Sequence, residues 1–120
     1  MKLLKNMTLS LFIAVSTAGI SSIAVAGAAE VAVDNVSAKV AEASQAIEGG
    51  STQEEVMDLI RTAADLVKEV EVSDTLDVRR QRANGHLKKA RLASKSGDLN
   101  AAKEHLAQAA KDFSDLRKLM

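Results

Sequence analysis

Two histidines, His86 and His105, are the residues of this 120-residue sequence that are best suited to metal chemistry. Each one directly precedes an apolar position of a predicted helix, Leu87 for the first and Leu106 for the second, so both flank the predicted core in the same way. His86 lies 11 residues before the predicted turn at Gly97, and His105 lies 8 residues after it. In an antiparallel hairpin this mismatch is about 4.5 Å along the axis. The spacing therefore predicts that the two imidazoles converge.

Two imidazoles and one oxygen ligand form a donor set that suits Cu(II), Ni(II) or Zn(II) in an open, weak site. Glu104 and Gln108 are the nearby candidates for the oxygen ligand. The sequence thus predicts a metal site at His86 and His105, with copper or nickel as the expected ion. The competing interpretation is that both histidines are ordinary surface residues.

The residue types that are missing exclude several other functions. The sequence has no Cys, which excludes disulfide bonds, thiolate metal sites, covalent haem attachment, cysteine catalysis and a lipid-modified N-terminal cysteine. Phe113 is the only aromatic residue after residue 26, so the chain lacks a platform on which bases could stack. The Glu-x-x-His motif of di-metal carboxylate sites does not occur. We therefore expect neither an enzyme nor a nucleic-acid partner.

The first 26 residues have the layout of a secretory signal peptide. Two lysines lie at the start, residues 7–25 are uncharged and mostly apolar, and small residues surround the predicted cleavage site after Ala26. Cleavage after Ala28 is the second choice. The alternative is a retained membrane anchor, because the apolar stretch comes near the length of a bilayer span. Cleavage would leave one domain, residues 27–120, without a membrane span, in the periplasm or secreted.

Charge is balanced over the whole chain but divided unevenly along it. Residues 27–120 carry 14 basic and 16 acidic side chains, a net charge of −2, because Lys2 and Lys5 are the only charged residues before them. Residues 51–71 have a net charge of −4 and residues 74–97 a net charge of +5. One interpretation is that the two regions are neighbours that attract each other. The other is that the basic region binds anionic lipid or an acidic partner.

Stop and cap residues predict four helices in a chain that contains no Pro to interrupt them. The predicted helices run from a cap at Asp34 to about Glu48, from a capping box at Ser51 and Glu54 to about Glu71, from Ser73 or Asp74 to near Gly97, and from Asp98 nearly to the C-terminus. Short connections favour antiparallel neighbours. The prediction is an all-α fold: an antiparallel up-down four-helix bundle made of two helical hairpins, preceded by the signal peptide.

Each predicted helix has an apolar stripe at steps of three and four residues, which gives the candidate core. The stripes are Val36, Val40, Ala43 and Ile47; Val56, Leu59, Ala63, Leu66 and Val70; Leu76, Ala83, Leu87, Ala90 and Ser94; and Leu99, Ala102, Leu106, Ala109, Phe113, Leu116 and Met120. Gly85 lies inside the third helix, where we expect an irregular turn. A shift of 47 residues aligns the stop, cap and apolar positions of the two halves, which indicates a duplicated hairpin.

Two segments, VDNVSAKVAEASQAI and NGHLKKARLASKSGDLNAAKEHLAQAAKDF, resemble the small metal-binding proteins of bacteria, and the similarity covers nearly all of residues 27–120. These proteins are short, exported, Cys-free four-helix bundles with a helical-hairpin repeat and many histidines, and they are thought to bind copper, nickel and similar divalent ions. His86 and His105 fall where that family has histidines. Lys39 and Asp98 stand where other family histidines would fit, so the resemblance implies a low metal capacity.

The layout also resembles periplasmic four-helix haem b proteins, which need a Met on the first helix and a His near the end of the last. The first predicted helix has no Met, and Arg117 stands in the corresponding region of the last helix. We therefore expect no haem. The predicted function is weak binding of divalent transition metal ions by an exported bundle. The alternative is a non-metal interaction or stress protein that acts through charged helix faces on a partner that the sequence does not identify.

Overall fold

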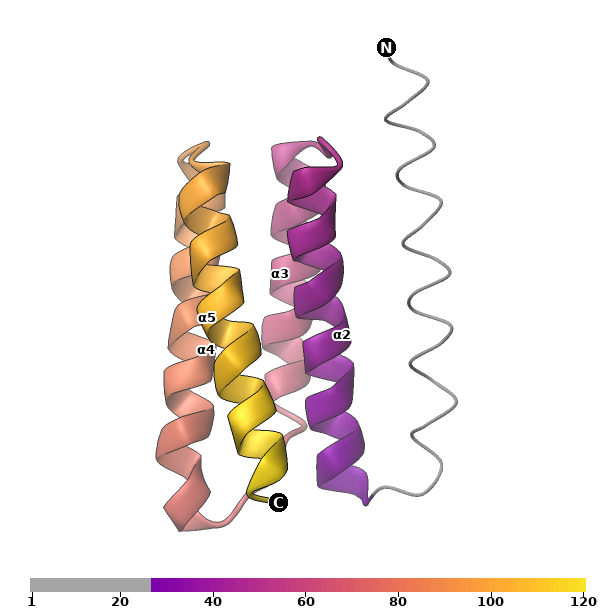
Figure 1. The fold of residues 1–120 in the computed structure, drawn as a ribbon, viewed down its shortest axis with the longest axis vertical. Coiled ribbons are helices and arrows are strands. Elements are labelled where there is room, and N and C mark those ends of the chain that lie inside the picture. Colours follow the sequence, from indigo (N-terminus) through magenta and orange to yellow (C-terminus); the bar gives the residue numbers. More distant parts are fainter. Residues whose placement is uncertain (1–26) are drawn as a thin grey trace.

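The computed structural model describes residues 27–120, which form four helices and no strand. The helices are α2 (Ala28–Glu48), α3 (Gln53–Val67), α4 (Asp74–Lys95) and α5 (Leu99–Lys118), and they lie together as a bundle (Figure 1). The predicted signal peptide and its cleavage site after Ala26 lie outside the described residues. Within residues 27–120, no helix combines the length and the apolar character that crossing a membrane requires.

Two of the predicted helix starts are confirmed and one is displaced by a residue. Asp98 caps α5, where its Oδ1 accepts a hydrogen bond of 3.0 Å from the Ala101 N–H. Ser73, one of the two candidates, precedes α4, although its side chain makes no capping hydrogen bond. The start of α3 is corrected: the cap is Thr52, whose Oγ1 accepts from the Glu55 N–H at 3.2 Å, instead of Ser51 with Glu54. A hydroxyl side chain caps α3 as expected, but it belongs to the residue after the predicted one.

Three other expectations about the helices are wrong. The first helix begins at Ala28 instead of Asp34, because the Ala- and Val-containing segment before Asp34 continues the helix and buries Ala32 and Val33. Helix α3 ends at Val67, four residues before the expected Glu71. Helix α4 runs through Gly85 without interruption, so the irregular turn is absent. A single glycine costs a helix about 1 kcal/mol, which the packing of its neighbours offsets.

The core lies along the shared axis of the four helices and consists mainly of alanine and valine. The stripes of α4 and α5 are confirmed at Ala83, Leu87, Ala90 and Ser94 and at Ala102, Leu106, Ala109, Phe113 and Leu116, with their outermost members partly buried. In α2, Val36, Val40 and Ala43 are buried as predicted, Ile47 is partly buried, and Ala46 is buried beside it. Phe113 is the largest side chain that is fully buried.

In and just after α3, the predicted positions Val56, Ala63 and Val70 are buried, but two positions between them differ from the prediction by one residue. Ile60 and Val67 are buried, whereas Leu59 and Leu66 of the predicted stripe are only partly buried. At each of these two places a leucine is followed directly by another apolar residue, so the apolar face of the helix is wide. Either residue could face the core. The bundle buries the β-branched side chains, and the leucines flank them.

Neighbouring helices differ in how closely they are joined. The contact between α4 and α5 is the most extensive of the four neighbouring pairs, and the contact between α3 and α4 is the least extensive. Figure 1 shows the α2–α3 and α4–α5 connections at one end of the bundle and the α3–α4 connection at the other. The first two connections contain Gly50 and Gly97, whose φ angles of 78° and 85° require the left-handed region that glycine adopts without strain.

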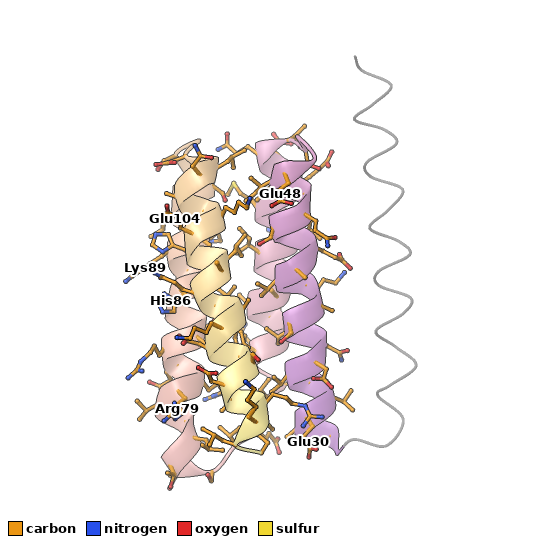
Figure 2. The ribbon with its side chains drawn as sticks, viewed as in Figure 1. Glu30, Glu48, Arg79, His86, Lys89 and Glu104 are labelled. Atoms are coloured by element: carbon orange, nitrogen blue, oxygen red, sulfur yellow. The ribbon has the colours of Figure 1, made fainter. Side chains whose placement is uncertain are left out.

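Ion pairs hold α5 to α2 near both ends of the bundle. Lys103 lies 2.5 Å from Glu48, while Arg117 lies 3.1 Å from Asp34 and 3.5 Å from Glu30. Figure 2 shows Glu48 and Glu30 near opposite ends of α2. This pair of helices is therefore joined by charge as well as by the core, whereas no ion pair among residues 27–120 joins α3 to α4.

Candidate functional site

The structure places His86 against a carboxylate of the next helix. The Nε2 atom of His86, on α4, lies 3.2 Å from Oδ2 of Asp112, on α5, and the two side chains are only 20% and 24% exposed. The extensive α4–α5 contact brings these flanking positions together. Figure 2 shows His86 on the same side of the bundle as Lys89 of α4 and Glu104 of α5.

Asp112 is the member of this candidate site that sequence reasoning missed. It lies seven residues after His105, hence on the same face of α5, about 10.5 Å further along the axis. The sequence argument considered only Glu104 and Gln108 as oxygen ligands. The heptad spacing of His105 and Asp112 is the signal that would have pointed to Asp112.

Three polar atoms of this region are shielded from solvent and have no hydrogen-bond partner in the described part of the chain. They are Nδ1 of His86, Nδ1 of His105 and Oδ2 of Asp112. Asp112 Oδ2 approaches His86 Nε2 to 3.2 Å without hydrogen-bond geometry. Buried polar atoms are normally hydrogen-bonded, and those that are not call for an explanation such as an ion or a water molecule.

The geometry supplies two protein ligands and not a closed cage. Among residues 27–120, no group of three or more His, Cys, Asp and Glu side chains is arranged to hold a metal ion. His105 is partly buried on α5, two turns before Asp112. An imidazole nitrogen and a carboxylate oxygen are donors that borderline divalent ions accept, and water would complete the coordination. The arrangement is therefore suited to an open site.

A second feature of the surface is a groove between α3 and α4. It consists of two recesses, of about 440 Å³ and 310 Å³, which share Arg91, and we call it the α3–α4 groove. Its lining includes the cations Arg61, Lys68, Arg80, Lys88, Arg91 and Lys95, the carboxylates Asp58 and Asp65, and the apolar residues Met57, Ala64, Val67 and Leu92.

The acidic and basic regions predicted to be neighbours do lie side by side, but they do not neutralise each other. Arg61 pairs with Asp58 at 2.7 Å, Lys68 with Asp65 at 3.6 Å and Arg80 with Asp77 at 2.5 Å, and each pair lies within one helix. In the described part of the chain, no ion pair joins α3 to α4.

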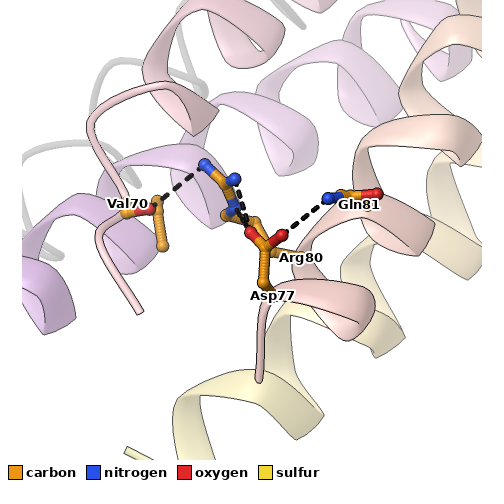
Figure 3. Close-up of polar contacts among 4 residues, drawn as sticks. All are labelled: Val70, Asp77, Arg80 and Gln81. Carbon is orange, nitrogen blue, oxygen red and sulfur yellow. Dashed lines mark hydrogen bonds and ion pairs between the residues drawn. The ribbon is translucent and has the colours of Figure 1, made fainter. Parts of the chain in front are cut away.

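At both ends of the α3–α4 groove, a hydrogen bond joins α4 to α3 or to the segment that follows α3. Gln53 Nε2 donates to the Lys95 carbonyl at 2.8 Å, where α3 begins. Near the other end, Arg80 Nη1 donates to the Val70 carbonyl at 3.4 Å. Asp77 fixes this part of α4, because its Oδ1 accepts from Arg80 Nε at 2.9 Å and its Oδ2 accepts from Gln81 Nε2 at 2.6 Å (Figure 3). Between these two contacts, side chains of both helices line the groove.

Comparison with known proteins does not place this chain in a family. The resemblance to small metal-binding proteins therefore stays a prediction from the sequence. No family model, curated protein or solved structure matches the chain.

Proposed function

We propose that this chain is an exported helical-bundle protein that binds one divalent transition metal ion weakly at His86 and His105. His86 and Asp112 supply the two donor atoms that already lie close together, and His105 would have to turn its side chain toward them to become the third ligand. The observation that carries the proposal is the approach of His86 to Asp112 at 3.2 Å, together with the unpartnered Nδ1 atoms of both histidines. A separation of about 3 Å is what two adjacent ligands of one ion need when each lies about 2.1 Å from it.

The proposal includes the antiparallel up-down arrangement of two hairpins and the removal of residues 1–26 on export. Connections at alternating ends of the bundle in Figure 1 support the first part. The basic, apolar and small-residue order of the first 26 residues supports the second. In this arrangement the flanks of α4 and α5 that carry the two histidines face each other.

The expected ions are Cu(II) and Ni(II), because imidazole with carboxylate and water suits them and because Cu(II) binds most tightly among the first-row divalent ions. Two imidazoles and one carboxylate on an open surface should give micromolar affinity at best. Ligation requires neutral imidazole, so protons compete with the metal ion for the histidines and binding should weaken in acid.

Calorimetric titration of the purified protein with Cu(II) and Ni(II) tests this proposal. We expect about one ion per chain, an affinity that falls at least tenfold in His86→Ala and in Asp112→Asn, and a smaller loss in His105→Ala. Asp115→Asn, on the same helix, is the matched control and should bind like the wild type. Unchanged binding by the variant that lacks both histidines would refute the proposal.

The alternative function, interaction through charged helix faces, rests on a different observation. Helices α3 and α4 are adjacent and oppositely charged, yet no ion pair among the described residues joins them. Exposed Arg79 and Arg82 on α4 could then hold the protein on an anionic surface. Sedimentation with anionic vesicles at low salt, compared with the Arg79→Gln/Arg82→Gln variant, tests this function. Equal sedimentation of both proteins would contradict it.

A further inference from the structure

Several cations of the α3–α4 groove lack a carboxylate partner. Lys88, Arg91 and Lys95 form no ion pair in the part of the chain that the structure describes, and all three are exposed. On α4 they follow one another at three and four residues, so they line one face of the helix. The metal site uses none of them, because it lies where α4 meets α5.

The surface between these cations is partly apolar, and the carboxylate that also lines the larger recess, Asp65, pairs with Lys68. Leu92 is 60% exposed and lines the larger recess together with Ala64 and Val67, while Met57 lines the smaller one. A single exposed leucine is common on protein surfaces. Here, however, the leucine belongs to the wall of a recess that also carries positive charge, so one ligand could contact both kinds of surface.

The dimensions of the groove favour a small, elongated molecule. The recesses of about 440 Å³ and 310 Å³ lie in the range of small-molecule sites. From Arg80 to Lys95, the lining of α4 extends over roughly 22 Å along the helix axis.

We propose that the α3–α4 groove binds a free amphiphile with a single alkyl chain and an anionic head group. Lys88 and Arg91 lie one turn apart and would hold the head group, where a guanidinium can donate two parallel hydrogen bonds. The alkyl chain would lie along Ala64, Val67 and Leu92. A polyanion without a chain would leave this apolar surface exposed to water, and a neutral amphiphile would leave the cations unpaired.

Calorimetric titration of the protein with octanoate, decanoate and dodecanoate, each below its critical micelle concentration, tests the proposal. Each added CH₂ that enters the groove should raise the affinity about twofold to fourfold. Acetate and decyl maltoside, which lack the chain and the charge respectively, should bind weakly or not at all. Circular dichroism on the same samples shows whether the helices remain intact.

Two pairs of matched variants connect the binding to this groove. Lys88→Gln/Arg91→Gln should lower the affinity for decanoate about fivefold, while Lys111→Gln/Lys118→Gln removes the same charge from exposed positions of α5 outside the groove and should leave it unchanged. Leu92→Ser should reduce the dependence on chain length, and Leu119→Ser, at another exposed leucine, should not.

Three results would overturn the proposal. The first is an affinity that does not depend on chain length, and the second is equal binding of decyl maltoside and decanoate. The third is an equal loss of affinity for decanoate in the two double variants. All three can be obtained without a metal ion, so failure of the groove proposal is distinct from failure of the metal site.

Discussion

Replacing Phe113 with alanine should remove a large share of the stability of this bundle. Among residues 27–120, Phe113 is the largest side chain that is fully buried. Its buried neighbours are mostly alanine and valine, which are short and cannot extend into the space that the ring leaves. Truncation of a buried Phe costs about 3–5 kcal/mol, so we expect a loss of at least roughly 3 kcal/mol here.

That loss is large compared with the whole free energy of unfolding. A domain of 94 residues, 27–120, is expected to have about 5–14 kcal/mol in total. A loss of roughly 3 kcal/mol raises the unfolded fraction about a hundredfold and should lower Tm by about 12–24 °C.

Urea denaturation followed by circular dichroism measures the effect, with Ser114→Ala as the control at the adjacent exposed position. Phe113→Leu should fall between alanine and the wild type, because most of the volume is kept. An unchanged denaturation midpoint for Phe113→Ala would show that the ring is not part of the core, and the packing described above would then be wrong.

Three further substitutions have expected outcomes. Gly85→Ala should stabilise the protein by about 0.5–1 kcal/mol, because α4 is continuous there and an added Cβ meets no atom within 4 Å; a lower Tm would contradict the continuous helix. Asp98→Ala should cost about 1 kcal/mol in urea denaturation through loss of the α5 cap, whereas an unchanged midpoint would mean that the cap contributes nothing. Arg117→Ala should cost about 0.5–1 kcal/mol at low salt and less at high salt, since its two carboxylate partners are one-third exposed; a loss that does not depend on salt would show that packing and not charge is responsible.

Much of the fold follows from local signals in the sequence. The capping aspartate of α5, the glycine turns and the apolar stripes of α4 and α5 each act within a few residues, so the sequence predicts them well. Errors arose where two local solutions are nearly equal. Ser51 and Thr52 can both cap α3, and either of two adjacent apolar stripes can face the core from it. Tertiary packing decides between such alternatives.

The candidate site was less accessible to prediction because it depends on the rotation and axial offset of two helices. Heptad counting placed His86 and His105 on facing flanks, but it could not show that His86 contacts Asp112. The α3–α4 groove was missed for a related reason. Opposite net charges predicted mutual attraction, whereas the ion pairs form within each helix and leave several cations of α4 facing solvent.

The central claim is that a metal ion binds where α4 meets α5, and paramagnetic broadening by Cu(II) tests it most directly. In ¹H–¹⁵N spectra of the protein at substoichiometric Cu(II), the amide signals around His86, His105 and Asp112 should broaden first, and His86→Ala should abolish this pattern. Broadening that is centred on the N-terminal amine or on the acidic face of α3, and that persists in the His86→Ala variant, would contradict the claim.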